Sequence, residues 1–210
     1  MKNNYDNIAG IYDFLSRLIF GTAIRKSQAS LIRHIESGSK ILIVGGGTGW
    51  ILEEICKIHE NELSISYIEM SVKMIERAKK RNCKENEVKF INCAIEDFVS
   101  DEPFHTVFTP FLFDNFREEK AGLVFNKINS LLLEGGQWLH VDFVLKASSP
   151  AWQKVLLKAM YLLFRLVCNI EAAKLPEMEG RFNSYHYYLV LSQPFFSGFI
   201  WASLYKKPER

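Results

Sequence analysis

The feature that most constrains this chain is the run ILIVGGGTGW at residues 41–50, in which four apolar residues lead into four glycines within five positions. A short apolar run is typical of a buried strand, and helical spacing follows it. Glycines at such a junction permit a tight turn and let a ligand approach the backbone, and the N-terminus of the following helix favours negative charge. Because clustered glycines cost stability, we interpret this stretch as a binding loop.

The same alternation of strand and helix continues along the chain. We expect strands at residues 40–44, 63–68, 88–93, 106–110 and 137–145. Helices are expected at residues 25–35, 49–59, 71–81 and 118–133, the last closed by Gly135 and Gly136. This order predicts an α/β fold, Rossmann-like and doubly wound, with a mostly parallel sheet and helices on both faces.

The end of the chain breaks the alternation. Residues 150–177 have the pattern of one long helix, and two β-rich runs follow at residues 184–193 and 199–206. The link between these runs is too short for a helical crossover, so they must be antiparallel neighbours. The prediction is a seven-stranded sheet with one reversed strand near the edge and a helical lid. We expect a single domain over 1–210: an N-terminal lid segment (1–24), a cofactor-binding core (25–145), a helical insertion (146–183) and a closing strand pair (184–210).

Composition excludes several classes. The net charge of +2 is too small to argue for nucleic acid. The four cysteines show no C-x-x-C spacing, which favours buried thiols in a reducing compartment over a metal site or disulfides. The N-terminus lacks an apolar signal-peptide core, and no uncharged apolar stretch is long enough for a transmembrane segment. We therefore expect a cytoplasmic protein without a bound metal.

The spacing of the glycines and the position of Glu69 narrow the classes of ligand that the loop could bind. Counting from Gly45, the sixth position is Trp50, so the loop reads G-x-G-x-G and lacks the last small residue of the dinucleotide fingerprint. Glu69 stands at the end of the second expected strand. A carboxylate there can accept both hydroxyl hydrogens of a ribose, which suits a nucleotide as well as S-adenosylmethionine.

Four segments of the sequence resemble motifs of one protein family. ILIVGGGTGW followed by YIEMSVKMIERAKKR resembles the first two motifs of class I S-adenosylmethionine-dependent methyltransferases, and LLLEGGQWLHVDF resembles their later helix–turn–strand signature. The closing run FIWASLYKKP resembles the reversed seventh strand of that family. The resemblance implies S-adenosyl-L-methionine as cofactor. It assigns the following residues to the cofactor: Gly45, Gly46, Gly47, Gly49, Glu69, Met70, Ile95, Glu96 and Asp97.

Two positions depart from that family. Ile43 stands where an acidic residue usually lies near the amino group of the methionine moiety, and Ala94 stands where an aspartate is common near the adenine. The amine is then held by backbone carbonyls and water or by a carboxylate from elsewhere. Asp114, after the fourth expected strand, is a candidate for that carboxylate and for a contact with the substrate.

Methyl transfer from a sulfonium is a direct displacement with a neutral leaving group, so the protein must mainly align the acceptor and exclude water. A base helps only where the acceptor loses a proton. Asp142, near the carboxyl end of the fifth expected strand, is our candidate for a catalytic base or an acceptor-orienting group. We expect His140 to be packed and hydrogen-bonded, and His105 to lie at a strand edge on the surface.

The acceptor is indicated by two further segments. YDNIAGIYDFLSRLIFG, with Tyr12 and Phe14 as candidate substrate contacts, resembles the entry segment of the ubiquinone/menaquinone C-methyltransferase branch. LLKAMYLLFRLVCNIEAAKLPEM resembles the insertion of that branch. The resemblance implies a small, apolar or aromatic acceptor such as a quinone. The alternatives are a non-catalytic binding or scaffold protein with a degenerate site, and an aminopropyltransferase-like relative.

The helix expected after the fifth strand is unusually apolar. Its polar residues Lys154, Lys158, Arg165 and Asn169 fall within a narrow arc of a helical wheel. We expect its wide apolar face to rest partly on the rest of the fold and partly to roof the acceptor pocket. A homodimer interface is the alternative, and a membrane-surface role is less favoured because the basic face is narrow.

Overall fold

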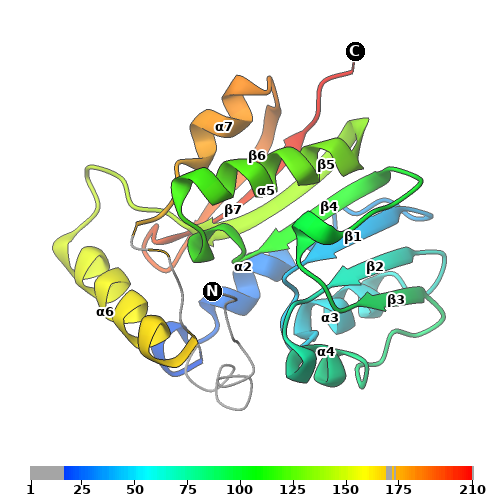
Figure 1. The fold of residues 1–210 in the computed structure, drawn as a ribbon, viewed down its shortest axis with the longest axis horizontal. Helices are drawn as coiled ribbons and strands as arrows, with labels where there is room; N and C mark the ends of the chain where they lie inside the picture. Colours follow the sequence, from blue (N-terminus) through cyan, green and yellow to red (C-terminus); the bar gives the residue numbers. More distant parts are fainter. Residues whose placement is uncertain (1–16, 169–171, 173, 210) are drawn as a thin grey trace.

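The computed structural model describes residues 17–168, 172 and 174–209. They form one seven-stranded sheet in the order β3-β2-β1-β4-β5-β7-β6, shown in Figure 1. The strands are β1 (Lys40–Val44), β2 (Ser64–Ile68), β3 (Glu87–Ile91), β4 (Phe104–Pro110), β5 (Leu132–Phe143), β6 (Tyr188–Phe195) and β7 (Ile200–Lys206). Strands β1 to β5 are parallel, whereas β7 runs antiparallel to both β5 and β6. The predicted fold class, including the reversed strand near the edge, is confirmed.

The helices cover both faces of this sheet. They are α2 (Ala23–Ile32), α3 (Trp50–Ile58), α4 (Val72–Ala78), α5 (Glu118–Leu131), α6 (Ala151–Cys168) and α7 (Met178–Ser184), with short 3-10 turns η2 (Ile95–Asp97) and η3 (Phe113–Asn115). Side chains of α2, α3, α4 and α6 join the hydrophobic cluster on one face, and those of α5 and α7 join the cluster on the other.

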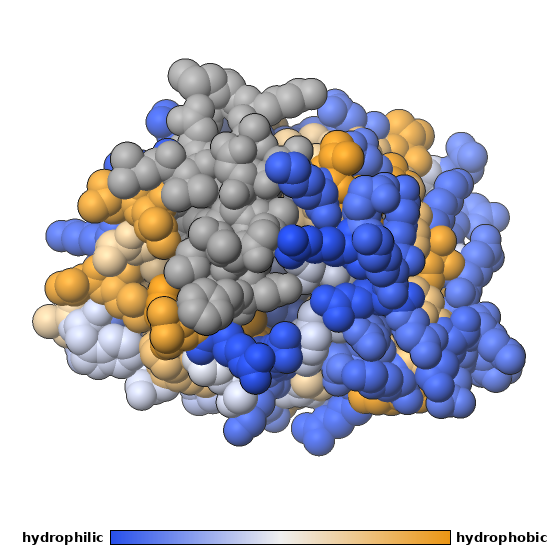
Figure 2. Space-filling view, turned by 90° about the horizontal axis from the view of Figure 1, so that it is seen from below, coloured by the Kyte–Doolittle hydropathy of each residue, from blue (hydrophilic) through white to orange (hydrophobic). Residues whose placement is uncertain are grey.

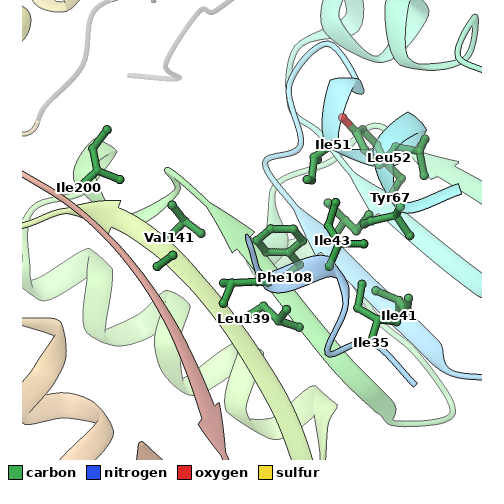
Figure 3. Close-up of a cluster of buried hydrophobic side chains, with 14 of the residues drawn as sticks. Ile35, Ile41, Ile43, Ile51, Leu52, Tyr67, Phe108, Leu139, Val141 and Ile200 are labelled. Carbon is green, nitrogen blue, oxygen red and sulfur yellow. The ribbon is translucent and has the colours of Figure 1, made fainter. Parts of the chain in front are cut away.

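Strand β1 shows how the sequence produces this arrangement. Ile41 and Ile43 belong to the first cluster, and the alternate residues Leu42 and Val44 belong to the second. Successive side chains of a strand point to opposite faces, so an uninterrupted apolar run is what a doubly covered strand requires. Figure 3 shows Ile41 and Ile43 packed with Phe108 and side chains of neighbouring elements.

The helical region after β5 differs most from the sequence-based expectation. The long helix predicted for residues 150–177 ends at Cys168, and a separate helix, α7, occupies Met178–Ser184, where the first closing strand was expected to begin. The Glu177 side chain caps α7 by accepting from the Gly180 N–H, a signal we did not read from the sequence. Pro176 precedes it, and such a residue is poorly tolerated inside a helix.

The glycine pair at Gly135 and Gly136 also acts differently from the prediction. Helix α5 ends at Leu131, and both glycines lie inside β5, where the register against β4 shifts. Gly135 has a left-handed φ of 70°, which suits an irregular segment of a strand. The pair therefore does not close a helix.

Helix α6 lies at one end of the sheet, at the left in Figure 1. The first described residues, drawn in dark blue from residue 17 on, lie close to it. Within the described residues, no helix combines the length and the apolar character needed to cross a lipid bilayer.

Candidate functional site

A cavity of about 190 Å³ opens at the carboxyl ends of β1, β2 and β4. The loop after β1 and the residues Glu69 and Met70 after β2 form one part of its wall. Residues 17–25, the segment 110–116 after β4, and α6 form another part. Ligands of doubly wound sheets bind beyond the carboxyl ends of the strands, so the cavity lies where the topology places a ligand.

The clustered glycines of the loop are required for different structural reasons. A Cβ added to Gly46 would collide with the Tyr67 ring, and one added to Gly49 would lie 2.7 Å from the backbone of Ala78 in α4. These two glycines therefore allow the loop and α3 to pack closely. Gly47 is different, because its added Cβ would meet nothing closer than the Met74 sulfur at 4.0 Å, and the residue lines the cavity with a φ of 63°.

Glu69 connects β2 to the glycine loop. One carboxylate oxygen accepts from the Gly47 N–H at 3.0 Å, and the other accepts from the Ser71 N–H at 2.8 Å. The Ser71 hydroxyl in turn caps α4 by accepting from the Met74 N–H at 3.1 Å. Glu69 is buried and lines the cavity, so a carboxylate is present where the ribose was predicted to bind.

Two residues that the sequence analysis missed hold this arrangement. The Asn92 side-chain amide, just after β3, donates to the carbonyls of Glu69 at 2.8 Å and Met70 at 3.0 Å. The Tyr67 hydroxyl donates to the Gly47 carbonyl at 3.0 Å. A polar residue directly after a parallel strand is a recognisable signal, and Asn92 could have been selected on that ground.

The loop predicted to frame the adenine is only partly at the cavity. Ile95 and Glu96 line it together with Met70. Asp97 is exposed and is not among the lining residues, and Gly49 also lies outside the lining. Cys93, which the prediction did not include, does line the cavity.

An acidic pair lies behind the segment that follows β4. Asp142 is buried in β5, and its carboxylate accepts from three backbone N–H groups, those of Phe113 at 3.0 Å, Asp114 at 3.3 Å and Phe143 at 2.8 Å. Asp114 lines the cavity, whereas Asp142 does not. The Asn115 side-chain amide donates to the Asp114 carboxylate at 2.8 Å.

The two carboxyl groups differ in their electrostatics. Burial raises the pKa of Asp114 well above its ordinary value, and the negative charge of Asp142 raises it further. Burial raises the pKa of Asp142 to about 7, although its three N–H donors favour the charged form. Asp142 is therefore the member that ionises first, and Asp114 is held neutral by its neighbour. A neutral carboxyl in a cavity can donate a hydrogen bond as well as accept one.

The two histidines have structural surroundings. His140 is buried between the rings of Phe113 and Phe182, and its Nδ1 lies 3.2 Å from the Thr109 hydroxyl oxygen. Burial lowers the pKa of His140 to about 4, so it is neutral near pH 7. His105 is exposed in β4, and its Nδ1 accepts from the Lys40 N–H at 2.9 Å.

The second part of the wall is apolar and comes from distant segments. Phe20 packs against Phe143 and Phe196 at ring-centroid distances of 5.3 and 5.1 Å. Helix α6 contributes Met160 and Leu163. The Tyr161 hydroxyl donates to the Asp114 carbonyl at 3.2 Å, so α6 is tied to the segment after β4.

Near the glycine loop the wall becomes polar again. The Arg25 guanidinium lies 5.0 Å above the Trp50 ring, and Gln28 lines the cavity beside it. Neither residue was singled out from the sequence, because both belong to a helix that is ordinary in composition. The candidate substrate residues Tyr12 and Phe14 lie outside the described residues.

Comparison with known proteins agrees with this geometry. Residues 41–136 match the family described as a methyltransferase domain. The ubiquinone/menaquinone biosynthesis C-methyltransferase UbiE of Geotalea daltonii is 28% identical over 198 residues, covering 91% of this chain and 78% of that protein. Residues 41–136 therefore carry the methyltransferase domain, and the comparisons support an S-adenosylmethionine-dependent methyltransferase.

Solved structures show the same fold at low sequence identity. The Burkholderia thailandensis 1,6-didemethyltoxoflavin-N1-methyltransferase, solved with 1,6-didemethyltoxoflavin and S-adenosylhomocysteine, aligns with a TM-score of 0.65 at 14% identity, over 96% of this chain and 88% of that one. A chain of the Haloferax volcanii complex between the Trm112 methyltransferase activator and a putative methyltransferase aligns with a TM-score of 0.73 at 11% identity, over the full length of both chains.

S-adenosyl-L-methionine is thus the cofactor of this methyltransferase, and the residues present fit it. The wall offers an open approach at Gly47 and a buried carboxylate at Glu69. Ile43 is fully buried in the hydrophobic cluster, so the place where the family usually has an acid contributes none here. Asp114 is a carboxylate that lines the same cavity.

Proposed function

We propose that this methyltransferase acts on a small, apolar or aromatic acceptor such as a quinone, held between the glycine loop and α6. The single observation that carries the proposal is the continuous cavity. One part of its wall has the features of a cofactor site, and the other is built from aromatic and aliphatic side chains of residues 17–25, the segment 110–116 and α6. Apolar pockets with a few placed polar groups are typical of sites for small molecules.

The bound cofactor supplies an electrophilic methyl group. For the cofactor we assign the loop at Gly45, Gly46 and Gly47 to close backbone approach, and Glu69 to the ribose hydroxyls. Met70, Ile95 and Glu96 are assigned to the adenine side, since all three line the cavity. Glu69 must then give up or share its bonds to the N–H groups of Gly47 and Ser71 when the ribose binds.

The acceptor side excludes water and orients the acceptor. Phe20, Phe143, Met160 and Leu163 provide apolar walls, and water exclusion protects an electrophilic methyl group from side reactions. Asp114 is the polar group we assign to the acceptor or to the methionine amine. Burial and the charge of Asp142 raise the pKa of Asp114, so its neutral carboxyl can donate a hydrogen bond to an oxygen of the acceptor as well as accept one.

We assign Asp142 an orienting role through the backbone. Its carboxylate is already used by three N–H donors, two of which belong to η3 next to Asp114. It therefore acts on the acceptor by holding η3 and by keeping Asp114 neutral. For Asp142 to be the base itself, the first form of the hypothesis, its carboxylate would have to reach the cavity, whose lining includes Asp114 and not Asp142.

A quinone-like acceptor is supported by the similarity to the UbiE protein, whose name assigns it to ubiquinone and menaquinone biosynthesis. The aromatic walls around Phe20 and Phe143 are independent support. The low net charge agrees with a small-molecule acceptor rather than a nucleic acid. We also propose a cytoplasmic location, on the basis of the scattered cysteines.

The test is a transfer assay with purified protein, labelled S-adenosylmethionine and a panel of acceptors. The panel contains hydroquinones with an unsubstituted ring carbon, monophenols, aliphatic amines and polyamines. The proposal expects label in the hydroquinones and an equal amount of S-adenosylhomocysteine. Transfer to the amines alone, or tight cofactor binding without transfer to any aromatic acceptor, would contradict it. Transfer of an aminopropyl group from the decarboxylated cofactor would favour the aminopropyltransferase alternative.

A further inference from the structure

Helix α6 has an outer face that the fold does not use. Met160 and Leu163 face the cavity, and Leu157 and Tyr161 are buried. On the opposite side, Val155 is 66% exposed and Leu162 is 63% exposed. Trp152, at the start of the helix, is 43% exposed and packs its ring partly against Phe196 and Phe199. A single exposed apolar residue needs no explanation, but several on one helix face indicate an interaction surface.

The charges beside this face all have one sign. From Asp142 to Glu171 the sequence contains the cations Lys146, Lys154, Lys158 and Arg165 and no acidic residue between the two. Lys154, Lys158 and Arg165 are exposed. At about 100° per residue they occupy one flank of the helix, and Leu162, Val155 and Trp152 follow on the other side of the same outer face. The sequence analysis gave a membrane-surface role less weight because the basic face is narrow, but the structure adds an exposed apolar stripe directly beside these cations. That combination is the arrangement of helices that lie in a membrane interface.

The face of the molecule seen in Figure 2 is also more hydrophobic on one side than on the other. In Figure 2 hydrophobic residues gather on the left, the side on which Figure 1 places α6, and hydrophilic residues dominate on the right. The left side also includes the start of the described chain, where Leu18 is 70% exposed next to Arg17. Arg17 lines the cavity, so this exposed apolar region adjoins the rim of the acceptor site.

We propose that the outer face of α6 docks on an anionic lipid bilayer surface. Val155 and Leu162 enter the headgroup region with the exposed edge of Trp152, while Lys154 and Lys158 contact the lipid phosphates. Arg165 lies on the same flank, where it also donates to the Ala172 carbonyl at 3.2 Å. The helix lies in the interface and does not cross the bilayer, in agreement with the absence of a spanning helix among the described residues. Each cation near such a surface strengthens binding about fivefold, and each buried apolar side chain adds to it.

A second copy of the chain is a poorer occupant of this face. A two-fold symmetric interface brings a patch against itself, so the cations of one α6 would face those of the other. Between Asp142 and Glu171 there is no acidic residue to neutralise them. Anionic lipid supplies the opposite charge directly.

Docking at this face also offers a route for the acceptor, a step that rests on the proposed function. Leu163 lines the cavity and Leu162 is the adjacent exposed residue, so the same helix borders both the lipid and the acceptor site. An acceptor dissolved in the bilayer could then enter beside α6 without crossing water.

The test is flotation of the purified full chain with vesicles, without cofactor or acceptor, so that its outcome is independent of the proposed function. Vesicles of phosphatidylglycerol and phosphatidylcholine in equal parts should bind the protein, and pure phosphatidylcholine vesicles should bind it much more weakly. The double variant Lys154→Glu/Lys158→Glu should lose about tenfold or more of the affinity for anionic vesicles. Leu162→Asp should lose affinity as well.

Matched controls lie on other elements. Leu123 in α5 is 63% exposed, so Leu123→Asp introduces the same charge at the same exposure away from the proposed surface and should bind vesicles as the parent does. Lys80→Glu/Lys206→Glu makes the same change in net charge at two exposed sites elsewhere and should cause a smaller loss than the α6 pair. No binding by the parent to anionic vesicles overturns the proposal. A parent dimer that Leu162→Asp converts to monomer, seen by light scattering, overturns it in favour of a second copy.

Discussion

The two parts of the cavity wall are built in different ways. The cofactor part comes from two consecutive strand–helix units, in which Gly47 and Glu69 are joined by one hydrogen bond of 3.0 Å. The acceptor part is assembled from residues 17–25, the segment after β4, and α6, which are far apart in the sequence. The first part depends on local turn chemistry, and the second depends on how remote segments pack. Substitutions should therefore separate cofactor binding from acceptor turnover.

The largest effect is expected at Gly47. A valine there would be forced into a left-handed φ of 63° and would project into the cavity, so Gly47→Val should fold but lose at least about 100-fold in S-adenosylmethionine affinity by calorimetry. Gly38 is the matched control, because its φ is 73° and an added Cβ there also meets nothing within 4 Å, but it lies outside the cavity lining. Gly38→Val should lose stability only. Equal cofactor affinities for the two variants would remove the close-approach argument.

The next effect is expected at Glu69. Glu69→Ala removes the carboxylate assigned to the ribose and leaves the Gly47 N–H without its acceptor, so cofactor affinity should fall about tenfold or more. Glu69→Gln is the conservative control, because it keeps the shape and one acceptor oxygen, and it should lose less. Binding by Glu69→Ala as tight as that of the parent would show that the ribose lies elsewhere.

Substitutions in the acceptor part of the wall should lower acceptor turnover and leave cofactor affinity unchanged. Leu163→Asp places a charge in the apolar wall and should lower kcat/KM for the acceptor about tenfold or more, while S-adenosylmethionine affinity and molecular mass stay the same. Its neighbour provides the control, since Leu162→Asp makes the same change on the exposed side of α6 and should leave turnover of a water-soluble acceptor unchanged. If Leu163→Asp kept its turnover but changed a parent dimer into a monomer, α6 would be an interface and not a wall.

The sequence predicts the cofactor part of the wall better than the acceptor part. The run ending at Val44, the glycine loop and Glu69 are local signals, and the strand β1 was predicted to the residue. The reversed β7 followed from a link too short for a crossover. The break between α6 and α7 was missed, because the apolar pattern continues across it and the cap at Glu177 is a weak signal.

Residues that work through a remote partner were the hardest to predict. Asp142 was selected for its place at the end of β5, but its engagement by the N–H groups of η3 depends on the register between β4 and β5. Phe20 and Gln28 reach the cavity only through the packing of residues 17–32 against the sheet. No sequence spacing connects these positions with Gly47, so only the folded chain brings them together.

The smallest effect is expected from the acidic pair at the junction of the two parts, and it concerns stability. A carboxyl whose pKa is raised on folding binds more protons in the folded state, so the free energy of unfolding falls as pH rises through the raised pKa. Since the pKa of Asp142 rises from 3.8 to about 7 on folding, this residue should make the protein lose stability as pH rises from about 4 to 7, and the raised pKa of Asp114 acts in the same direction. His140 has the opposite slope, because its pKa is lowered from 6.5 to about 4, but that contribution is complete near pH 6.5.

Asp114→Asn isolates this effect, since an amide can still accept from Asn115 but carries no charge beside Asp142. The variant should be more stable than the parent at pH 8, and the difference should shrink as pH falls toward 4, where the carboxyl of Asp114 is protonated in the unfolded chain as well. Urea unfolding at pH 4, 6 and 8 without cofactor measures the difference. Glu119→Gln, at an exposed carboxylate of α5, is the control and should follow the parent at every pH. A constant difference between Asp114→Asn and the parent across this range would mean that the two carboxyl groups do not share one charge, and the neutral Asp114 assigned to the acceptor would have to be abandoned.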